Sequence, residues 1–201
     1  MEIRNVDKSE TELIDQIVQI HLETFQGFFL SFMGAGFLKQ MYLSYCEHDA
    51  SSLAVALDER GKSVGFVAFS TEQSDLYKHM IKRHLIAFGW YSLGAFFRKP
   101  QVFMRLVRAF LKPSETVRDE QYVELSSIGV SPECKSRGIG SQLIDYVKQQ
   151  TDFSRYAYVS LETDALNNEA ANHFYVKNGF ELKRTYTTHE GRRMNEYRYR
   201  R

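Results

Sequence analysis

The sequence contains little cysteine and proline and no long apolar run. Two Cys and three Pro occur among 201 residues. Cys46 and Cys134 lie far apart and provide neither a disulfide framework nor a Cys/His metal cage, which suits a reducing cytoplasm. No stretch of about 18 residues is free of charged and polar groups, so no segment is expected to span a membrane. Because the first ten residues carry charges where a signal peptide is apolar, we expect a cytoplasmic protein.

The charge is nearly balanced overall but unevenly distributed. The chain has 26 Lys and Arg against 25 Asp and Glu, which argues against a generally basic nucleic-acid-binding protein. Residues 75–113 nevertheless hold eight basic residues and one acid, Asp75, so this segment carries +7 and the rest of the chain −6. A basic amphipathic segment with aromatics is suited to an anionic membrane surface. The alternative is that its aromatics pack on the sheet or on a partner subunit in a homodimer. Helical spacing of Phe103, Leu106, Val107 and Phe110 fits both interpretations.

Periodicity and turn signals predict alternating strands and helices. The order is β-α-α-β-β-(helical insert)-β-α-β-α-β-β, which predicts an α/β or α+β layered domain with a mixed sheet. A length of 201 residues suggests one domain, 1–201, with a basic aromatic insertion at about 75–113. A glycine-punctuated aromatic segment, 27–37, follows the first helix. The predicted strands are 2–6, 51–57, 63–70, 122–130, 156–162, 180–187 and 193–200, and the helices are 10–25, 36–47, 138–150 and 168–177.

The most informative segment is Lys135-Ser136-Arg137-Gly138-Ile139-Gly140, which opens a helix just after a strand ends. Glycines let the backbone approach a ligand closely, and the free N–H groups of a helix start favour a phosphate. Two cationic side chains add charge at the same place. The Walker motif G-x-x-x-x-G-K-[ST] and the dinucleotide motif G-x-G-x-x-G are both absent. The alternative is a glycine-rich helix start that serves packing alone.

This loop resembles the acyl-CoA pyrophosphate loop of the GCN5-related N-acetyltransferases, [Q/R]-x-x-G-x-[G/A]. Lys135 stands where that family usually has Gln or Arg, and it keeps the cation without the planar fork. Residues 168–180 resemble the family segment N-x-x-A-x-x-x-Y-x-x-x-G-F, with every named position present. The two motifs occur in the family's order, and the resemblance covers nearly the whole chain except the insertion. It implies a mixed, mostly antiparallel central sheet flanked by helices.

The resemblance also implies transfer of an acetyl group from acetyl-CoA to a primary amine by direct attack. A β-bulge would splay strand 122–130 from strand 156–162, with the pantetheine arm in the gap. The residues implied to bind the cosubstrate are Ile128 and Val130 through their backbone, Lys135, Arg137, Gly138, Gly140 and Ser141 at the pyrophosphate, and Asn168 facing the pantetheine.

Amine attack needs a group that accepts a proton and one that protonates the departing thiolate. Tyr175 matches the family's usual general acid, and its alternative role is that of a half-buried helix aromatic. Glu124 is the candidate base. On a period-2 strand it would share a face with Ser126 and Ile128; the alternative is a solvated strand carboxylate. Glu162 and Asp164 are weaker candidates to orient the acceptor.

No metal site is expected, because His79 and His84 are five residues apart and not at the i, i+4 spacing of a helical metal pair. In the family the first helices and their loop shape the acceptor site, which here is residues 27–37. This loop is apolar and aromatic, with few acids, so the expected acceptor is an amino sugar or a similar small-molecule amine, and a lipid-linked form would suit the basic insertion. The alternatives are a protein or peptide N-acetyltransferase, for which a more acidic, open groove is expected, and a non-catalytic acyl-CoA-binding regulatory domain.

Overall fold

The strands form one mixed sheet in the computed structural model, which describes residues 1–98, 100, 120–188 and 191–201. Its order across the sheet is β1-β2-β3-β4-β5-β7-β6. The strands are β1 (Glu2–Asn5), β2 (Ser51–Leu57), β3 (Ser63–Ser70), β4 (Tyr122–Val130), β5 (Tyr158–Asp164), β6 (Glu181–Thr187) and β7 (Arg193–Tyr199). The helices are α1 (Thr11–Thr24), α2 (Phe29–Met33), α3 (Ala35–Glu47), α4 (Gln73–Arg98), α6 (Ile139–Gln150) and α7 (Glu169–Lys177), with a 3-10 turn, η1 (Pro132–Cys134).

The sheet is antiparallel except at one junction. Strands β1 to β4 pair antiparallel in chain order, β4 pairs with β5 in parallel, and β5, β7 and β6 pair antiparallel. This confirms the predicted mixed, mostly antiparallel architecture, and β2, β3 and β4 have the predicted bounds. The short helix α2 was not predicted: it lies between Gly27 and Gly34, both at positive φ, and five residues are too few to display a helical period.

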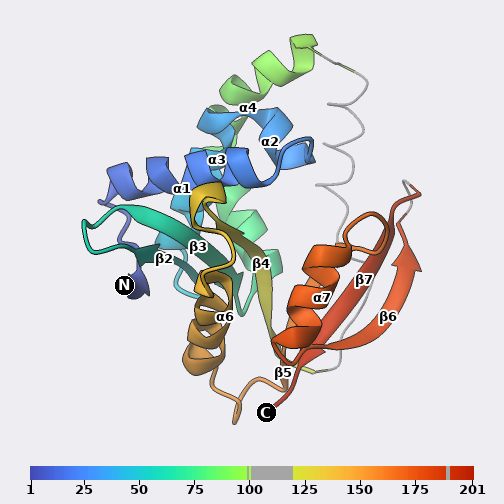
Figure 1. The fold of residues 1–201 in the computed structure, drawn as a ribbon. Helices are drawn as coiled ribbons and strands as arrows, with labels where there is room; N and C mark the ends of the chain where they lie inside the picture. The colour runs from blue at the N-terminus through green and yellow to red at the C-terminus, as the bar shows by residue number, and fades with distance from the viewer. Residues whose placement is uncertain (99, 101–119, 189–190) are drawn as a thin grey trace.

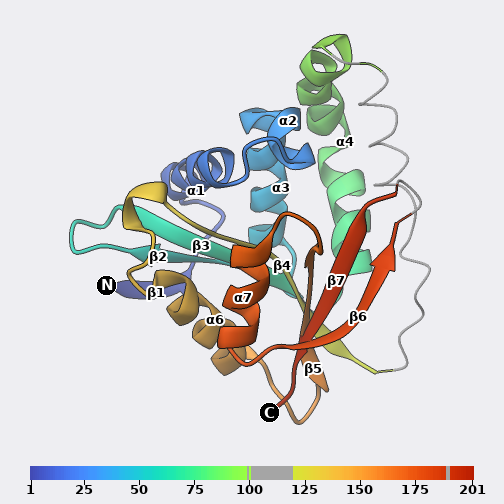
Figure 2. The same cartoon turned by 45° about the vertical axis from the view of Figure 1, so that its right-hand side comes forward.

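Helices cover both faces of the sheet, and alternate residues of the central strands are buried on opposite sides. Leu53 and Val55 of β2 pack with residues of α1, α3 and α4. Ala54 and Ala56 of the same strand pack in the second core with residues of α6. This is the period-2 alternation of a strand that is covered on both faces. Figures 1 and 2 show α1, α2 and α3 on one side of the sheet and α6 and α7 on the other.

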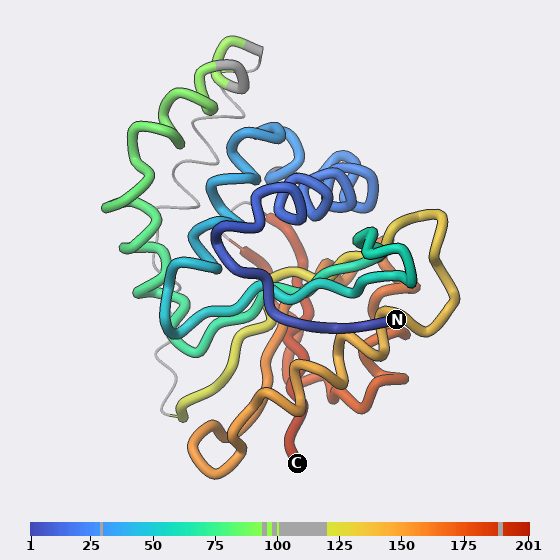
Figure 3. The backbone as a smooth tube through the Cα atoms, turned by 90° about the vertical axis from the view of Figure 1, so that its left-hand side faces the viewer, coloured from blue at the N-terminus to red at the C-terminus, as the bar shows by residue number. Residues whose placement is uncertain are grey.

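The long helix α4 forms the first part of the predicted insertion. Its first turns are part of the fold, because Leu76 and Met80 are buried in the core shared with α1 and α3. Later turns present large apolar side chains to solvent, with Ile86, Trp90 and Phe97 between 72% and 89% exposed. Figure 3 shows α4 and the loop leading into α6 on opposite sides of the molecule.

The remainder of the predicted insertion, with Phe103, Leu106, Val107 and Phe110, lies outside the described residues. Within the part that is described, no helix has both the length and the apolarity that a membrane span requires.

A buried polar chain connects α1, α3 and β4. His21 of α1 is 3% exposed, and its Nδ1 lies 2.6 Å from the hydroxyl of Tyr42 on α3. That hydroxyl lies 3.3 Å from Oγ of Ser127 on β4. Burial lowers the pKa of His21 to about 4, so the imidazole is neutral in the folded protein near pH 7. The neutral ring packs against Phe25 and Phe66.

This buried histidine predicts an acid-sensitive fold. The unfolded chain binds the His21 proton with a pKa near 6.5 and the folded chain with a pKa of about 4, so acidification favours unfolding. We expect the free energy of unfolding to fall as pH drops from about 6.5 to about 4, with a His21 contribution of about 3 kcal/mol. Urea unfolding across this range measures it.

The variant His21→Gln should reduce this pH slope, whereas His173→Gln, at an exposed position of α7, should leave it unchanged. An equal slope in His21→Gln and the wild type would contradict the assignment.

Candidate active site

A β-bulge in β4 opens the centre of the sheet. The register with β3 passes from Ala68↔Ser127 to Phe69↔Leu125, so Ser126 is an extra residue on β4. The parallel register with β5 runs through three residue pairs, Tyr122↔Tyr158 to Glu124↔Ser160, and ends there. The remaining residues of β4 diverge from β5, with α6 and α7 flanking the two strands (Figure 1). The predicted splay is therefore confirmed.

The diverging part of β4 presents backbone polar groups to the gap. Ser131 N–H donates to Val64 O over 2.9 Å, so Ser131 and Val64 form a hydrogen-bonded pair between β4 and β3. In an antiparallel ladder, every second residue pair is hydrogen-bonded. By that alternation Gly129 bonds to β3, while Ile128 and Val130 direct their N–H and C=O groups toward the β5 side. The carbonyl of Val130 accepts a bond of 3.2 Å from Oγ1 of Thr24. The backbone polar groups of Ile128 and Val130 therefore face away from β3.

The same bulge corrects one prediction about Glu124. Its neighbours Val123 and Leu125 lie in the core on the α6 side, so Glu124 faces the α4 side, and it shares that face with Ser126, which bonds to Gln73 of α4. Ile128 packs in the α6-side core as well. The prediction that Ile128 shares a face with Glu124 is therefore wrong, because the extra residue at the bulge reverses the alternation beyond it.

The predicted pyrophosphate loop follows η1 and ends at the start of α6. Ser136 and Gly138 have φ of 62° and 78°, so the chain turns sharply before the helix. Gly138 occupies the N-cap and has no side chain to offer, which leaves the first N–H groups of α6, those of Ile139, Gly140 and Ser141, without intrahelical partners. Lys135 and Arg137 are exposed beside them. This arrangement is suited to an anion with several oxygens.

Glycine is required at Gly138 and at Gly140 for different structural reasons. A Cβ on Gly138 would meet open space, so Gly138 is explained by its positive φ. A Cβ on Gly140 would lie 3.1 Å from two ring atoms of Phe174 on α7. Gly140 therefore lets α6 approach α7, which gives the packing interpretation of this glycine direct support.

The start of α7 is bonded to the end of β5. Asn168 donates through Nδ2 to Oγ1 of Thr163 over 2.7 Å. One turn later Asn172 donates to Asp164 O over 3.0 Å and accepts bonds from Asn195 and from the hydroxyl of Tyr197. Asn168 is thereby held at the strand end that borders the gap.

Tyr175 lies on the α7 side of the sheet, and Glu124 lies on the opposite side. The Tyr175 ring is half-buried among Phe174, Phe180 and Tyr197, with ring centroids 5.3, 6.1 and 6.0 Å away. Burial raises the pKa of Tyr175 to about 12, so the phenol keeps its proton at neutral pH. Because the sheet separates the two side chains, they can act on one reacting centre only through the gap between β4 and β5.

Residues of α4 that were not predicted surround Glu124. Gln73 accepts a bond of 3.2 Å from Oγ of Ser126 and donates to the hydroxyl of Tyr45 over 3.4 Å. Desolvation and then the carboxylates of Glu124 and Glu162 raise the pKa of Tyr77. In the sequence, the one indication that Gln73 and Tyr77 lie near Glu124 was that the insertion directly follows β3.

The two other acids at the end of β5 have bonded partners. Glu162 accepts a bond of 2.6 Å from the hydroxyl of Tyr186. Asp164 forms an ion pair of 2.8 Å with Arg192. Both lie on the face of β5 opposite Val159 and Leu161, which is the face of Glu124, and the paired Asp164 is less available to an acceptor.

A hollow of about 400 Å³ borders Glu124. Four carboxylates and two cations line it, together with hydroxyl, amide and tyrosine side chains. Its described lining residues are Ser70, Thr71, Glu72, Gln73, Ser74, Asp75, Lys78, Glu120, Gln121, Tyr122, Glu124, Arg155 and Tyr156.

Residues 27–37, the predicted acceptor loop, are not among these lining residues. The chain entering that loop lies at the other end of β4, where Thr24 bonds to Val130 and Phe25 lies 3.5 Å from the Cβ position of Gly129. An acceptor bound in the hollow would therefore contact α4 and β4.

The model of the Acetyltransferase (GNAT) family matches residues 14–180. The chain belongs to this family. It is an acetyl-CoA-dependent acetyltransferase, and the free helix start, the open strand edge and the cationic loop described above fit that cosubstrate. No curated protein sequence matches the chain significantly.

Solved structures with the same fold include acetyltransferases for different acceptors. An aminoglycoside 6′-acetyltransferase type Ii has a TM-score of 0.63 and 15% identity, with 100% of this chain and 97% of that chain covered. Chaetomium thermophilum Naa20 in complex with a bisubstrate analogue has a TM-score of 0.57 and 16% identity, covering 100% and 86%. Arabidopsis thaliana NAA60 in complex with acetyl-CoA has a TM-score of 0.58 and 15% identity, covering 99% and 97%. The acceptor class of this GNAT protein is not determined by such similarity.

The contact between Gly140 and Phe174 predicts a coupled pair of substitutions. Gly140→Val should cost about 1–3 kcal/mol of unfolding free energy because the added side chain meets the Phe174 ring. In the Phe174→Leu background the same substitution should cost less, as measured by urea unfolding of the four proteins of the cycle.

Gly138→Ala is the matched control. Its cost of about 1–2 kcal/mol arises from positive φ and should be the same in both backgrounds. Additivity of Gly140→Val and Phe174→Leu would contradict the packing role of Gly140.

Proposed function

We propose that this GNAT protein acetylates the primary amine of a small polyhydroxylated molecule, such as an amino sugar, by direct attack on acetyl-CoA. The observation that carries the proposal is the polar hollow beside Glu124. Its volume of about 400 Å³ is in the range of small-molecule sites. Its hydroxyl, amide and carboxylate groups offer hydrogen bonds to sugar hydroxyls, and Tyr122 and Tyr156 offer aromatic faces.

The charge of the hollow also favours an amine. Four acids, Glu72, Asp75, Glu120 and Glu124, line it with two cations, Lys78 and Arg155. An excess of carboxylates raises the local concentration of a cationic amine. The expectation from loop 27–37, which has few acids, does not apply to this hollow. Its acidic lining is the feature expected for the peptide alternative, so the charge supports an amine of either class, and the volume and the hydrogen-bonding groups support a small polyhydroxylated one.

The cosubstrate is proposed to bind along the gap from the α6 side. The N–H groups of Gly140 and Ser141, the turn at Gly138 and the cations of Lys135 and Arg137 would bind the pyrophosphate. The backbone groups of Ile128 and Val130 would pair with the pantetheine arm, as an added strand would. Asn168 would contact the arm from the start of α7.

The proposed reaction uses the two faces of the sheet. The amine approaches from the α4 side, and Glu124 removes its proton directly or through a water. The neutral nitrogen attacks the thioester carbon, so an N–C bond forms and the C–S bond breaks. Tyr175, on the α7 side, donates its proton to the departing thiolate. The whole chain is proposed to act as one catalytic domain, with α4 contributing to the acceptor side.

Glu124→Gln tests the proposed base. Loss of the carboxylate should lower kcat/KM for the amine by about 10²–10⁴-fold, while acetyl-CoA binding is unchanged. Steady-state thiol release and calorimetric titration with acetyl-CoA measure the two quantities. Glu120→Gln is the control, because Glu120 lines the same hollow and is held by Arg200 at the hollow's edge, with no role in the proposed reaction. Equal activity of the Glu124 and Glu120 variants would argue against the base.

Tyr175→Phe tests the proposed acid. The substitution removes the hydroxyl while keeping the ring, so kcat should fall by about 10²-fold or more with little change in stability. Because the pKa of Tyr175 is about 12, the wild-type rate should show no loss attributable to this group up to about pH 10.

Tyr146→Phe is the matched control, since its hydroxyl bonds to Asn5 away from the gap. A Tyr175→Phe enzyme with wild-type kcat would exclude the phenol as acid.

The acceptor class is tested with a panel of amines. We expect thiol release from acetyl-CoA with amino sugars and little with peptides that carry a free N-terminus or lysine. Turnover confined to the peptides would overturn the proposed acceptor and establish the peptide alternative.

A further inference from the structure

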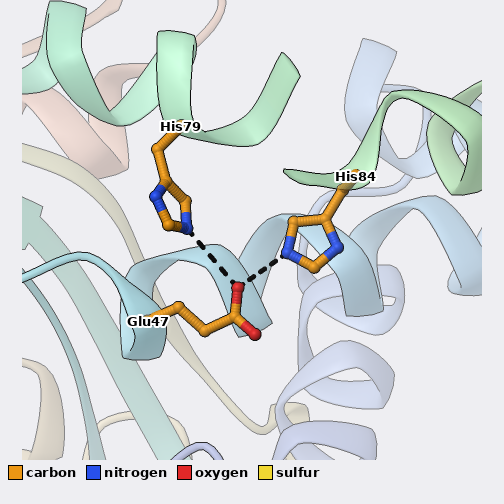
Figure 4. A group of neighbouring side chains, drawn as sticks. All are labelled: Glu47, His79 and His84. Carbon is orange, nitrogen blue, oxygen red and sulfur yellow. Dashed lines mark hydrogen bonds and ion pairs between the residues drawn. The ribbon is translucent and has the colours of Figure 1, made fainter. Parts of the chain in front are cut away.

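Two histidines of α4 converge on one carboxylate of α3. Glu47 is the last residue of α3, and its Oε2 lies 2.7 Å from Nε2 of His84 and 3.4 Å from Nε2 of His79. Figure 4 shows both imidazole rings pointing toward the Glu47 carboxylate. One ligand atom from each of the three side chains lies within 4.8 Å of the other two. Among the described residues, this is the one such group of three potential metal ligands.

The five-residue spacing of His79 and His84 predicts no metal site when the two residues are considered on one helix alone. The structure brings a third donor from α3 to the two imidazoles, and the five-residue spacing still leaves a ring nitrogen of one histidine within 4.8 Å of a ring nitrogen of the other. The three donors come from the two helices that pack together beside the sheet.

The three side chains are partly shielded from solvent but remain accessible to an ion. They are 13% to 27% exposed, which shields them but leaves a path for an ion.

The nearest other titratable groups hydrogen-bond to other partners, although the ring of His48 also lies 5.5 Å from the ring of His79. His48 bonds to Ser51 through Nδ1 over 2.9 Å and lies 3.4 Å from Asp75 through Nε2. Asp75 also pairs with Lys78 over 3.5 Å. His48 therefore serves as a neighbouring histidine outside the group of three.

We propose that Glu47, His79 and His84 bind a divalent transition-metal ion of the zinc type. Two imidazole nitrogens and one carboxylate oxygen are a common ligand set for Zn²⁺, with the fourth position open to water. Metal–ligand bonds of about 2.0–2.2 Å place tetrahedral ligands about 3.4 Å apart. The separation of 3.4 Å at His79 matches this value, and the 2.7 Å separation at His84 needs to widen by less than 1 Å. Imidazole ligands favour such ions over Mg²⁺ and Ca²⁺.

The bound ion would fix α4 against the end of α3. Gln73, Asp75 and Lys78 line the hollow beside Glu124 and lie within two turns of His79 on the same helix. A cation at this place would thus stabilise the helix that forms one wall of the hollow. The proposed ion takes no part in acetyl transfer, so the metal-site proposal does not depend on the proposed acceptor.

The test is metal binding by the untagged, full-length protein after treatment with a chelator. We expect one Zn²⁺ per chain by elemental analysis and calorimetry, and a higher melting temperature with Zn²⁺ but not with Mg²⁺ or Ca²⁺. Replacement of the ion by Co²⁺ should give the visible absorption of a tetrahedral site.

The variants Glu47→Gln and His84→Gln should each weaken Zn²⁺ binding by roughly 100-fold or more. His48→Gln and His173→Gln are the matched controls and should bind like the wild type. Wild-type affinity in the Glu47 and His84 variants, or loss of binding in His48→Gln alone, would overturn the site.

A measurement on the unmutated protein guards against variants that fail to fold. The chain has six His, and Zn²⁺ should shift the imidazole NMR signals of His79 and His84 most, with a smaller shift at His48, whose ring contacts His79. Shifts at any other pair of histidines, or none at one equivalent of Zn²⁺, would contradict the proposal.

Discussion

The bulge at Ser126 is the constraint on which the rest of this structure depends. One extra residue ends the parallel pairing of β4 with β5 and turns the backbone groups of Ile128 and Val130 toward the gap. It also places Glu124 and Ile128 on opposite faces of the strand. The acceptor side and the cosubstrate side are thus separated by a single insertion in one strand, and the two helices α6 and α7 border the opening that results.

The polar groups on the two faces of the sheet differ in kind, and each set suits a different ligand. The α4 side collects carboxylates, amides and tyrosines around Glu124, while the α6 side presents free helix N–H groups and exposed cations for an anion. Tyr175 is half-buried among aromatic rings, and burial raises its pKa to about 12. The near-neutral net charge of the chain conceals this arrangement, because the acids and bases are segregated in space.

Much of the fold was predictable because its signals are local. The strand patterns of β2, β3 and β4 and the glycines of the loop before α6 each depend on neighbouring residues, and the family motif around Tyr175 is contiguous. The exchange of faces at Ile128 was not predictable, because a bulge has no fixed sequence pattern. The positions of Gln73 and of Glu47 beside His79 were hidden for another reason: they depend on how α4 packs on α3, which a one-dimensional spacing rule cannot represent.

The short seam between β4 and β5 has a mechanical consequence. Three residue pairs join the half of the sheet formed by β1 to β4 to the half formed by β5, β7 and β6. On the outer side, α6 and α7 are fastened by the contact of Gly140 with Phe174 and by the bond of 2.7 Å from Lys148 Nζ to Asn178 O. Because the three pairs lie at one end of the gap, any rotation of one half about them would change the width most at the far end. A ligand that bonds to both β4 and β5 would therefore hold the two halves together where the described strands are not paired.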